Sequence, residues 1–234
     1  MTSKYLYLFI ELSCLLIPLL ASFYSKAPFY KSWKDISVAI LVPAIIFIVW
    51  DEAFTQAGIW GFNPRYISGI DIGSLPIEEI LFFICIPYAC LFTYFVVQYS
   101  VTNDYFFLNH ELLSFAITII LLIAGIFFID KAYTAATFIG LSFYIAFLTL
   151  KVRARYLGYF YTAFGFILIP FFIVNGILTG MFTDEAVVWY NDEANLRLRL
   201  GTIPVEDLFY AMFLMLLNVS LFEWMQVTRG KNKT

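Results

Sequence analysis

The sequence predicts an all-α integral membrane protein, in which seven transmembrane helices form two parallel three-helix repeats joined by a linking helix. The first observation is composition, since 62% of the 234 residues are hydrophobic and 13% are charged. A soluble domain carries about 25% charged residues. The mean hydropathy is +0.85. Long apolar runs and a motif that occurs twice are the second and third observations, and together the three indicate a helix bundle surrounded by lipid.

Seven apolar runs are long enough to cross a bilayer, which takes about 20 mostly apolar residues per helix. Backbone groups cannot stay unpaired in lipid, and the alternating pattern of a β-barrel is absent, so we expect these runs to be helices. The first run lacks the basic flank and cleavage site of a signal peptide, and we expect it to be a span. The runs cover residues 4–24, 35–54, 76–97, 111–129, 133–150, 158–178 and 204–225.

The distribution of lysine and arginine predicts a multi-pass cell-membrane protein with its N-terminus outside and its C-terminus in the cytoplasm. Nine of these residues fall on one side of the predicted spans and five on the other, and the richer side is expected to be cytoplasmic. The richer side has Lys26, Lys31, Lys34, Lys151, Arg153, Arg155, Arg229, Lys231 and Lys233. The other side has Lys4, Arg65, Lys131, Arg197 and Arg199.

One motif opens two of the runs: "GSLPIEEILFF" begins at Gly73 and "GTIPVEDLFYA" begins at Gly201. The offset along the chain that carries Gly73 onto Gly201, called the repeat offset below, also aligns Asn63 with Asn191 in the preceding loops. The first three runs therefore match the last three. Four spans separate the copies, which is an even number, so both copies cross the membrane in the same direction.

This repeat divides the chain into three predicted parts. The first repeat is residues 1–100, the linking helix is residues 101–131, and the second repeat is residues 132–234. Parallel repeats are related by an axis along the membrane normal. The acids of the two motifs are therefore expected at similar depth on the same, outer side, either in one shared site or in two.

Each copy of the motif carries two adjacent acids, Glu78 and Glu79 in the first and Glu206 and Asp207 in the second. Acids at a helix start bind free amides and suit the positive end of the helix dipole, so capping alone would explain one acid per copy. Carboxyl groups at membrane depth are costly and mark functional sites. Neighbours on a helix point about 100° apart, so one acid can cap while the other faces the bundle. We expect these four acids to have a function beyond capping.

Aromatic and polar residues near the acids are the next candidates. Ring faces stabilise a nearby cation, although Trp and Tyr also gather at membrane interfaces. The expected cation-stabilising residues are Trp60, Phe62, Phe82, Trp189, Tyr190 and Tyr210. The expected supporting polar residues are Asp51, Asn175 and Asn191, with Asn175 as the counterpart of Asp51.

Several classes of function find no support in the sequence. The net charge of −3 provides no basic face for nucleic acid. One histidine and three scattered cysteines do not form a metal cluster. There is no GxGxxG or P-loop motif, no DDxxD diphosphate motif, and no lysine in the last run for a retinal Schiff base. We therefore expect no cofactor and no metal. Proton chemistry on a lipophilic molecule remains, or movement of protons and ions.

The motifs "LPIEE" and "IPVED", with "VNGILTG" (Val174–Gly180) and "VVWYN" (Val187–Asn191), resemble the membrane-embedded lycopene cyclase family. The resemblance covers nearly the whole chain with both copies in order, as in the fused single-chain form. It implies an isomerase, a lycopene β-cyclase that converts the ψ ends of lycopene to β-ionone rings and gives γ-carotene and β-carotene. A proton adds at C2, the C5=C6 bond captures the C1 cation, and a proton leaves from C6, without net redox change.

The resemblance also assigns the family's acidic motifs to the four acids, and either Glu78 or Glu206 is expected to be the general acid with the adjacent acid tuning it or accepting a proton. The substrate would be a carotenoid from the bilayer, and other enzymes of carotenoid synthesis are possible partners. The ring type (β or ε), the substrate length (C40 or C50) and the oligomeric state stay open. The alternative from another class is a proton-coupled transporter, which would favour acids in the middle of the spans.

Overall fold

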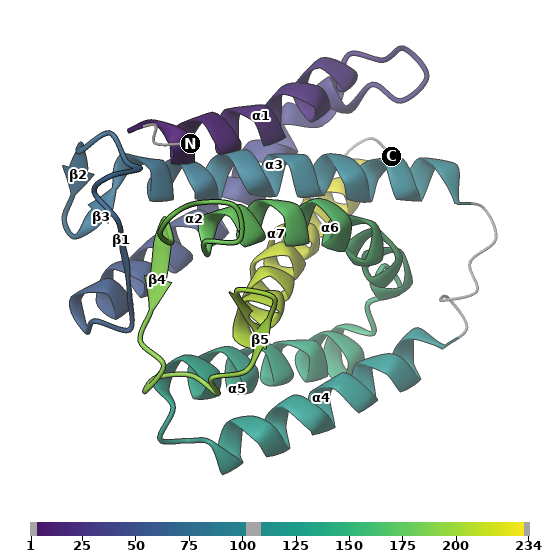
Figure 1. Cartoon of the computed structure of the whole chain (residues 1–234). Helices are drawn as coiled ribbons and strands as arrows, with labels where there is room; N and C mark the ends of the chain where they lie inside the picture. Colours follow the sequence, from purple (N-terminus) through teal and green to yellow (C-terminus); the bar gives the residue numbers. More distant parts are fainter. Residues whose placement is uncertain (1–3, 102–108, 232–234) are drawn as a thin grey trace.

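The computed structural model describes residues 4–101 and 109–231, and within them it contains seven α-helices (Figure 1). Of these helices, six are long and apolar enough to cross a membrane. The predicted all-α membrane fold is therefore confirmed. Residues 102–108 of the predicted linking segment, and Lys233, lie outside the described residues. The helices are α1 (Leu6–Ala21), α2 (Trp33–Gln56), α3 (Ile77–Ser100), α4 (His110–Phe127), α5 (Ala132–Phe147), α6 (Leu157–Leu178) and α7 (Val205–Lys231).

Helix α1 is shorter than the predicted span over residues 4–24. It has 16 residues, which corresponds to about 24 Å at the usual rise of an α-helix, and a typical hydrocarbon core is about 30 Å thick. The chain turns at Ser22, whose backbone N–H and hydroxyl both donate to the carbonyl of Pro18. A short 3₁₀ turn (Phe29–Ser32) then leads into α2. In the second repeat, a π-helical turn (Leu148–Val152) closes α5.

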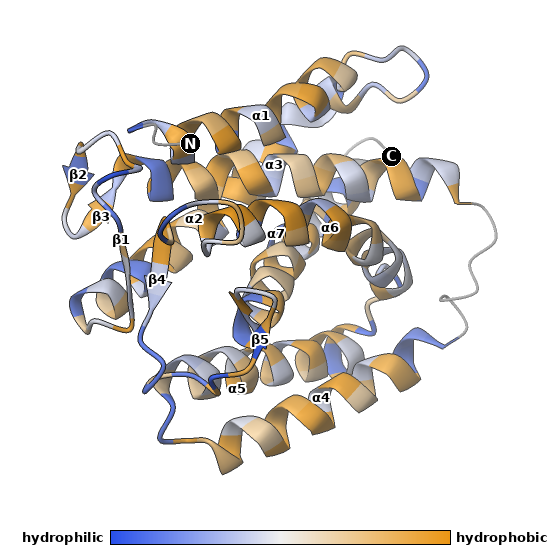
Figure 2. Cartoon of the chain, in the orientation of Figure 1, coloured by the Kyte–Doolittle hydropathy of each residue, from blue (hydrophilic) through white to orange (hydrophobic). Residues whose placement is uncertain are grey.

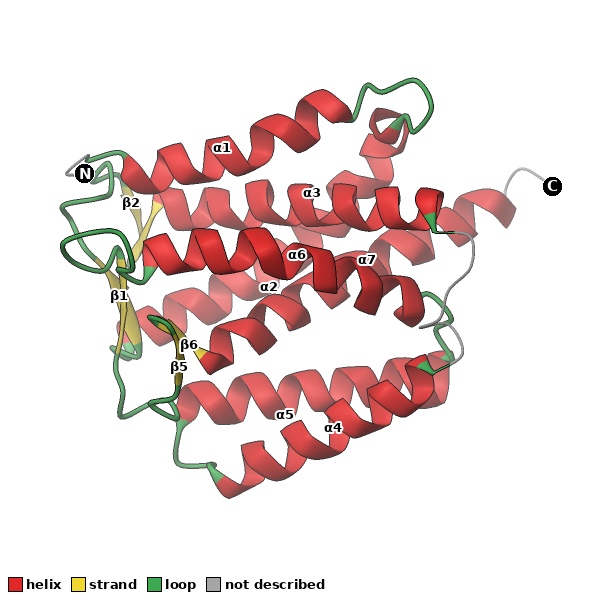
Figure 3. Cartoon of the chain, turned by 45° about the vertical axis from the view of Figure 1, so that its right-hand side comes forward, coloured by secondary structure: helices red, strands yellow, loops and turns green. Residues whose placement is uncertain are grey.

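Short strands gather at the end of the bundle where α1 begins, and α7 finishes at the opposite end (Figure 3). Two hairpins, β2–β3 and β5–β6, lead directly into α3 and α7, while β1 pairs with β4 across the two repeats. The sequence predicts loops here, because strands of two or three residues are too short to show alternation. The strands are β1 (Trp60–Phe62), β2 (Asp71–Ile72), β3 (Leu75–Pro76), β4 (Val188–Tyr190), β5 (Arg199–Leu200) and β6 (Ile203–Pro204).

The two hairpins have the same local structure at positions related by the repeat offset. The backbone N–H of Ile77 donates to the carbonyl of Ile70 at 2.8 Å, and that of Val205 donates to Leu198 at 2.9 Å. These bonds join the residue just before the first strand of each hairpin to the first residue of the following helix. Each long helix therefore begins in the same way, and the acids that follow occupy equivalent positions in the two repeats.

The pairing of β1 with β4 locates the symmetry axis that relates the repeats. The strands are antiparallel, with Trp60 opposite Tyr190 and Gly61 opposite Trp189. The repeat offset also aligns Gly61 with Trp189. Gly61 therefore pairs with its own equivalent in the second repeat, and the strand pair is symmetric about this point. Because both repeats cross the bundle in the same direction, the pseudo-two-fold axis runs along the helices, as a parallel repeat requires.

Helices from the two repeats pack against each other around this axis. Helix α6 packs against α3, and α2 packs against α7 as well as against α3. The first helix of each repeat lies further out, α1 on α3 and α5 on α7, and α4 lies outside α5 (Figure 1). Hydrophobic residues cover the helices and hydrophilic residues concentrate at the two ends of the bundle (Figure 2). The side of the membrane on which each end lies stays a prediction.

Replacing Gly73 with alanine is expected to destabilise the first hairpin. Gly73 has a φ of +68°, and an added Cβ would lie 2.8 Å from Oε1 of Glu52. A non-glycine residue in the left-handed region costs about 1–2 kcal/mol, so the protein should unfold at a lower temperature in a detergent thermal-shift measurement. Gly165→Ala is the matched control, because Gly165 lies in α6 with no atom within 4 Å of an added Cβ. Equal melting temperatures for the two variants would contradict the expectation.

Candidate active site

The second acid of each motif, Glu79 and Asp207, lies in one small pocket on the pseudo-two-fold axis. The pocket has a volume of about 50 Å³ and also includes Asp51 from the end of α2. The sequence leaves open whether the two motifs build one site or two, and the structure has acids of both repeats lining the same pocket. The rings that line it are those of Tyr7, Trp60, Phe62, Phe82, Tyr133, Tyr190 and Tyr210.

Asp207 accepts a hydrogen bond at each of its two carboxyl oxygens. The hydroxyl of Tyr133 donates to Oδ1 at 2.6 Å, and the hydroxyl of Tyr190 donates to Oδ2 at 2.9 Å. Burial and the nearby Asp207 carboxyl raise the pKa of Tyr190 well above its usual value, so Tyr190 remains a donor at neutral pH. Two hydroxyl donors therefore hold the carboxyl group of Asp207 in a fixed orientation.

Glu79 has a different set of partners. Its Oε2 accepts a hydrogen bond of 2.6 Å from the Tyr7 hydroxyl, and its carboxyl group contacts that of Asp51. Oδ1 of Asp51 accepts from the Tyr210 hydroxyl at 3.2 Å, while Oδ2 is buried without an N–H or O–H donor. Two carboxyl groups in contact repel each other unless a proton lies between them. Glu79 and Asp51 are therefore arranged to share one proton.

The pocket is symmetric in its backbone and asymmetric in its chemistry. The repeat offset relates Phe62 to Tyr190 and Phe82 to Tyr210, so the second repeat supplies hydroxyl groups where the first supplies plain rings. Asp51 adds a third carboxyl group, and it comes from the first repeat alone. As a result, the two acids on the axis have unlike surroundings.

The first acid of each motif accepts a hydrogen bond from a backbone N–H group instead. Oε1 of Glu78 accepts from the N–H of Ser68 at 2.7 Å, and Oε1 of Glu206 accepts from the N–H of Leu196 at 2.8 Å. The hydroxyl of Thr134 also donates to Glu206, at 2.5 Å. Both carboxyl groups are fully buried and neither lines the pocket. This geometry does not support the expectation that Glu78 or Glu206 is the general acid.

Three of the other predicted residues also lie outside the pocket. Trp189 is 46% exposed and packs its ring over Gly61 on the outer side of the strand pair. The side-chain amide of Asn175 donates to the carbonyl of Phe171 in its own helix. Oδ1 of Asn191 accepts from the N–H of Glu193 and shapes a turn. These residues have local structural contacts in place of the predicted site contacts.

The ends of α2 and α6 contact the two hairpins in different ways. In the first repeat, the carboxyl group of Glu52 accepts from the N–H of Ser74 at the tip of the hairpin. In the second repeat, the hydroxyl groups of Thr179 and Thr202 bond to each other at 2.7 Å. Ser74 and Thr202 are equivalent positions, so the two hairpins are held by different contacts. The correspondence of Asn175 with Asp51 stays a prediction.

Sequence reasoning missed Tyr7 and Tyr133, which bond to the two acids from the first helix of each repeat. Their backbone positions are equivalent, because the N–H of Tyr7 donates to Tyr66 and that of Tyr133 donates to Ala194, the residue that the repeat offset aligns with Tyr66. The same offset carries Tyr7 itself onto Ala135, so it does not align the two tyrosines. A search for tyrosines near the start of both first helices would have found them.

The arginines near the site pair with loop acids. Arg65 bonds to Asp184 at 3.1 Å, and Arg199 bonds to Asp192 at 2.6 Å. The hydrogen bond from Arg199 lowers the pKa of the Asp192 carboxyl. These exposed pairs join loops at the end of the bundle where the pocket lies. The hydrogen bonds to Asp51, Glu79 and Asp207 given above come from tyrosines and not from these arginines.

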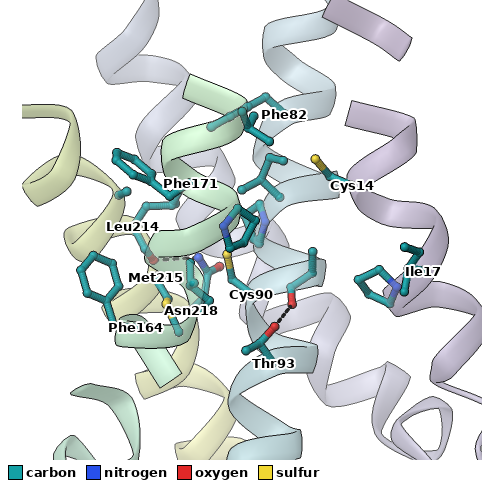
Figure 4. A pocket seen from close by; sticks show the side chains of 18 of the residues that line it. Cys14, Ile17, Phe82, Cys90, Thr93, Phe164, Phe171, Leu214, Met215 and Asn218 are labelled. Carbon is teal, nitrogen blue, oxygen red and sulfur yellow. Dashed lines mark hydrogen bonds between the residues drawn. The ribbon is translucent and has the colours of Figure 1, made fainter. Parts of the chain in front are cut away.

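A larger apolar cavity begins where the acidic pocket ends. It has a volume of about 300 Å³, and residues of α1, α3, α6 and α7 line it. Phe82 and Tyr210 line both spaces, so they form the junction between them. Cys14 of α1 and Phe171 of α6 lie on opposite sides of the cavity, with Cys90 of α3 between them (Figure 4). An elongated apolar molecule in this cavity would place one end at the acids.

Comparison with known proteins agrees with this arrangement. The sequence model of the lycopene cyclase family matches residues 4–97 and 130–225, the stretches that form the two repeats. Bifunctional lycopene cyclase/phytoene synthases are similar over shorter segments: the one from Aspergillus niger is 26% identical over 85 residues and the one from Aspergillus oryzae is 28% identical over 65 residues. These segments are 36% and 28% of this chain, and 15% and 11% of the two fungal proteins. No solved structure matches. Since the family's model matches most of the chain, the protein belongs to the lycopene cyclase family.

Proposed function

We propose that the protein is a lycopene β-cyclase, an isomerase that closes the ψ ends of lycopene into β-ionone rings by way of γ-carotene. One observation carries this proposal: Asp51, Glu79 and Asp207 meet aromatic rings in a pocket that continues into an apolar cavity. The names of the two fungal relatives include lycopene cyclase activity, which supports the same reaction here.

The first step needs an acid at the end of the cavity, and Glu79 is the donor in this proposal. Its carboxyl group lies beside that of Asp51 in the pocket, and in this proposal the two groups share one proton. Glu79 gives this proton to C2 of the ψ end, and the positive charge develops at C1. The negative charge left on the Glu79–Asp51 pair then stabilises the carbocation.

The second step closes the ring between aromatic walls. The C5=C6 bond attacks C1, and the positive charge moves to C5. Trp60, Phe62 and Tyr210 present rings around the pocket, which stabilise a cation and exclude water that would trap it. Asp207, held by two tyrosine hydroxyls, accepts the proton from C6 and leaves the C5=C6 bond of a β-ring. One proton enters and one leaves, so the reaction is a redox-neutral isomerisation.

The apolar cavity suits a carotenoid that arrives from the bilayer. Ser13 and Ile17 on α1 and Pro170 on α6 line it and are exposed on the lipid-facing surface. A substrate can therefore move sideways from lipid to the acids without crossing water. We keep the predicted topology, with the acidic pocket and the N-terminus on the outer side and the C-terminus in the cytoplasm.

Two alternatives differ in what they require. A proton-coupled transporter would need a polar route through the bundle, whereas the space that adjoins these acids is lined mainly by apolar side chains. A cyclase that forms ε-rings, or that acts on C50 carotenoids, would use the same donor. It would differ in which carbon loses its proton to Asp207, or in the length of the polyene.

The test is pigment analysis in a bacterial host that accumulates lycopene. Expression of the protein is expected to convert lycopene to γ- and β-carotene, separated by chromatography. The Glu79→Gln variant, present in the membrane at the same level, should leave lycopene unchanged. Rings of the ε type would correct the product, and unchanged lycopene with the wild-type protein would refute the proposal.

Tyr190→Phe is expected to slow cyclisation about tenfold or more while the protein stays folded. The variant removes the hydroxyl that donates to Oδ2 of Asp207, and a hydrogen bond to a charged group contributes about 1.5–3 kcal/mol. Tyr161→Phe is the control, because that buried hydroxyl bonds to Ser114 away from the pocket. Initial rates of lycopene loss in membranes measure the effect, and equal rates for both variants would count against a role for Tyr190.

A further inference from the structure

The repeat provides two equivalent places where a tunnel from the lipid could reach the acids. One lies between α1 and α6. The symmetry that relates α1 to α5 and α6 to α2 places the other between α5 and α2. Since the acids converge on the axis, each place is equally well situated to deliver a substrate. Side chains decide which of the two is open.

The place between α1 and α6 is open. The cavity of about 300 Å³ extends from the junction at Tyr210 to the surface, where Ile17 is 74% exposed. Ala211 on α7 and Phe171 on α6 both line this cavity. Alanine contributes only a methyl group to the lining at this position.

The equivalent place is filled by aromatic rings. The repeat offset aligns Ala211 with Phe83 on α3, and Phe83 is completely buried. Its ring centroid lies 6.2 Å from that of Phe47 on α2. Phe213 on α7 adds a second ring, 5.7 Å from Phe47, whereas the first repeat has Cys85 at the corresponding position. A large buried ring thus occupies the position equivalent to Ala211, which lines the open cavity.

From this asymmetry we propose that the site is single-ended: it admits one end of a linear polyene at a time through the α1–α6 opening. The inference rests on the proposed function. A conjugated polyene is stiff and holds its two ends far apart, so the second end cannot reach the acids while the first occupies the pocket. Between two cyclisations, the molecule with one ring leaves the tunnel, turns in the bilayer and enters again by its other end. The monocyclic γ-carotene is therefore a released product.

A time course with purified protein in liposomes tests the release. With lycopene in large molar excess over protein, free γ-carotene is expected to rise well above the protein concentration before β-carotene appears. Formation of β-carotene while γ-carotene never exceeds the protein concentration would overturn the single-ended site and leave the cyclase intact. The absence of any cyclic product would overturn the proposed function as well.

An isotope experiment tests the same point independently. Unlabelled γ-carotene is added during the conversion of ¹³C-labelled lycopene. If the monocyclic product is released, it mixes with the added pool, and the labelled fraction of β-carotene falls in proportion to the dilution. If both ends react before release, the label in β-carotene stays that of the lycopene, which would contradict the proposal.

A pair of equivalent variants tests which side is used. Ala211→Leu narrows the open tunnel and is expected to lower the initial rate about tenfold or more, because extra methylene groups in a fitted apolar space clash with its occupant. Phe83→Leu changes the filled side and should retain the wild-type rate. Monodispersity in detergent shows that both are folded, and Ala211→Val provides a milder change if Ala211→Leu is not. A wild-type rate for folded Ala211 variants would overturn entry between α1 and α6.

Discussion

Glu79→Gln is expected to lower the rate of cyclisation by about 10²–10⁴, the usual contribution of a general acid or base. Glutamine has the size of glutamate and its side-chain oxygen still accepts the hydrogen bond from Tyr7. It cannot give a proton to C2, and it cannot share a proton with Asp51. The variant should therefore reach the membrane in normal amounts and leave lycopene uncyclised. Initial rates in membranes with equal protein content measure the loss.

The adjacent residue supplies the matched control. In Glu78→Gln, the amide oxygen can still accept from the N–H of Ser68, so folding and activity should stay close to those of the wild type. Asp207→Asn should lose activity like Glu79→Gln, because its amide cannot accept the proton from C6. An active Glu79→Gln beside an inactive Glu78→Gln would return the catalytic role to the first acid of the motif.

Glu206→Ala is expected to lower the stability and the yield of the folded protein. The Glu206 carboxyl accepts from the N–H of Leu196 and from the hydroxyl of Thr134, both in a buried setting. A buried donor left without a partner costs about 1–3 kcal/mol, which makes about 2–6 kcal/mol for two. Proteins are commonly stable by about 5–15 kcal/mol. The yield of monodisperse protein after detergent extraction, and its thermal unfolding, measure the effect.

The conservative substitution at the same position separates folding from catalysis. Glu206→Gln keeps an oxygen that accepts from Leu196, so it should recover most of the folded protein and its activity. A Glu206→Ala protein that folds normally but fails to cyclise lycopene would show that Glu206 acts on the substrate, as the motif alone predicts.

Much of the fold is predictable from the sequence, because lipid makes strict demands. A run of about 20 apolar residues can form few structures in a bilayer besides a helix. Six of the seven predicted spans are helices of spanning length. The doubled motif likewise predicts two helices that begin in the same way, since a proline and a glycine define the local backbone. Helix α1 is the exception, because Ser22 and Pro18 close it early.

Which acid of each motif lines the pocket, and which bonds to the backbone, is not predictable from the motif alone. Glu78 and Glu79 are neighbours of the same chemical type, and which of them faces the pocket depends on where the loop amide of Ser68 lies. That amide belongs to an earlier turn with no distinctive pattern. Tyr7 reaches Glu79 from another helix altogether. Contacts of this kind depend on packing between helices, which periodicity along one helix does not report.

The β1–β4 pair has a consequence for how such a protein can arise. Its hydrogen bonds join the two repeats without needing a covalent link, so two separate copies of one repeat could meet through the same strands as a homodimer. In that ancestor the two acids on the axis would have identical neighbours, and donor and acceptor would be interchangeable. Once both copies lie in one gene, each can mutate alone. Fusion would then allow Phe62 and Tyr190, at equivalent positions, to become different and give one acid and one base permanent roles.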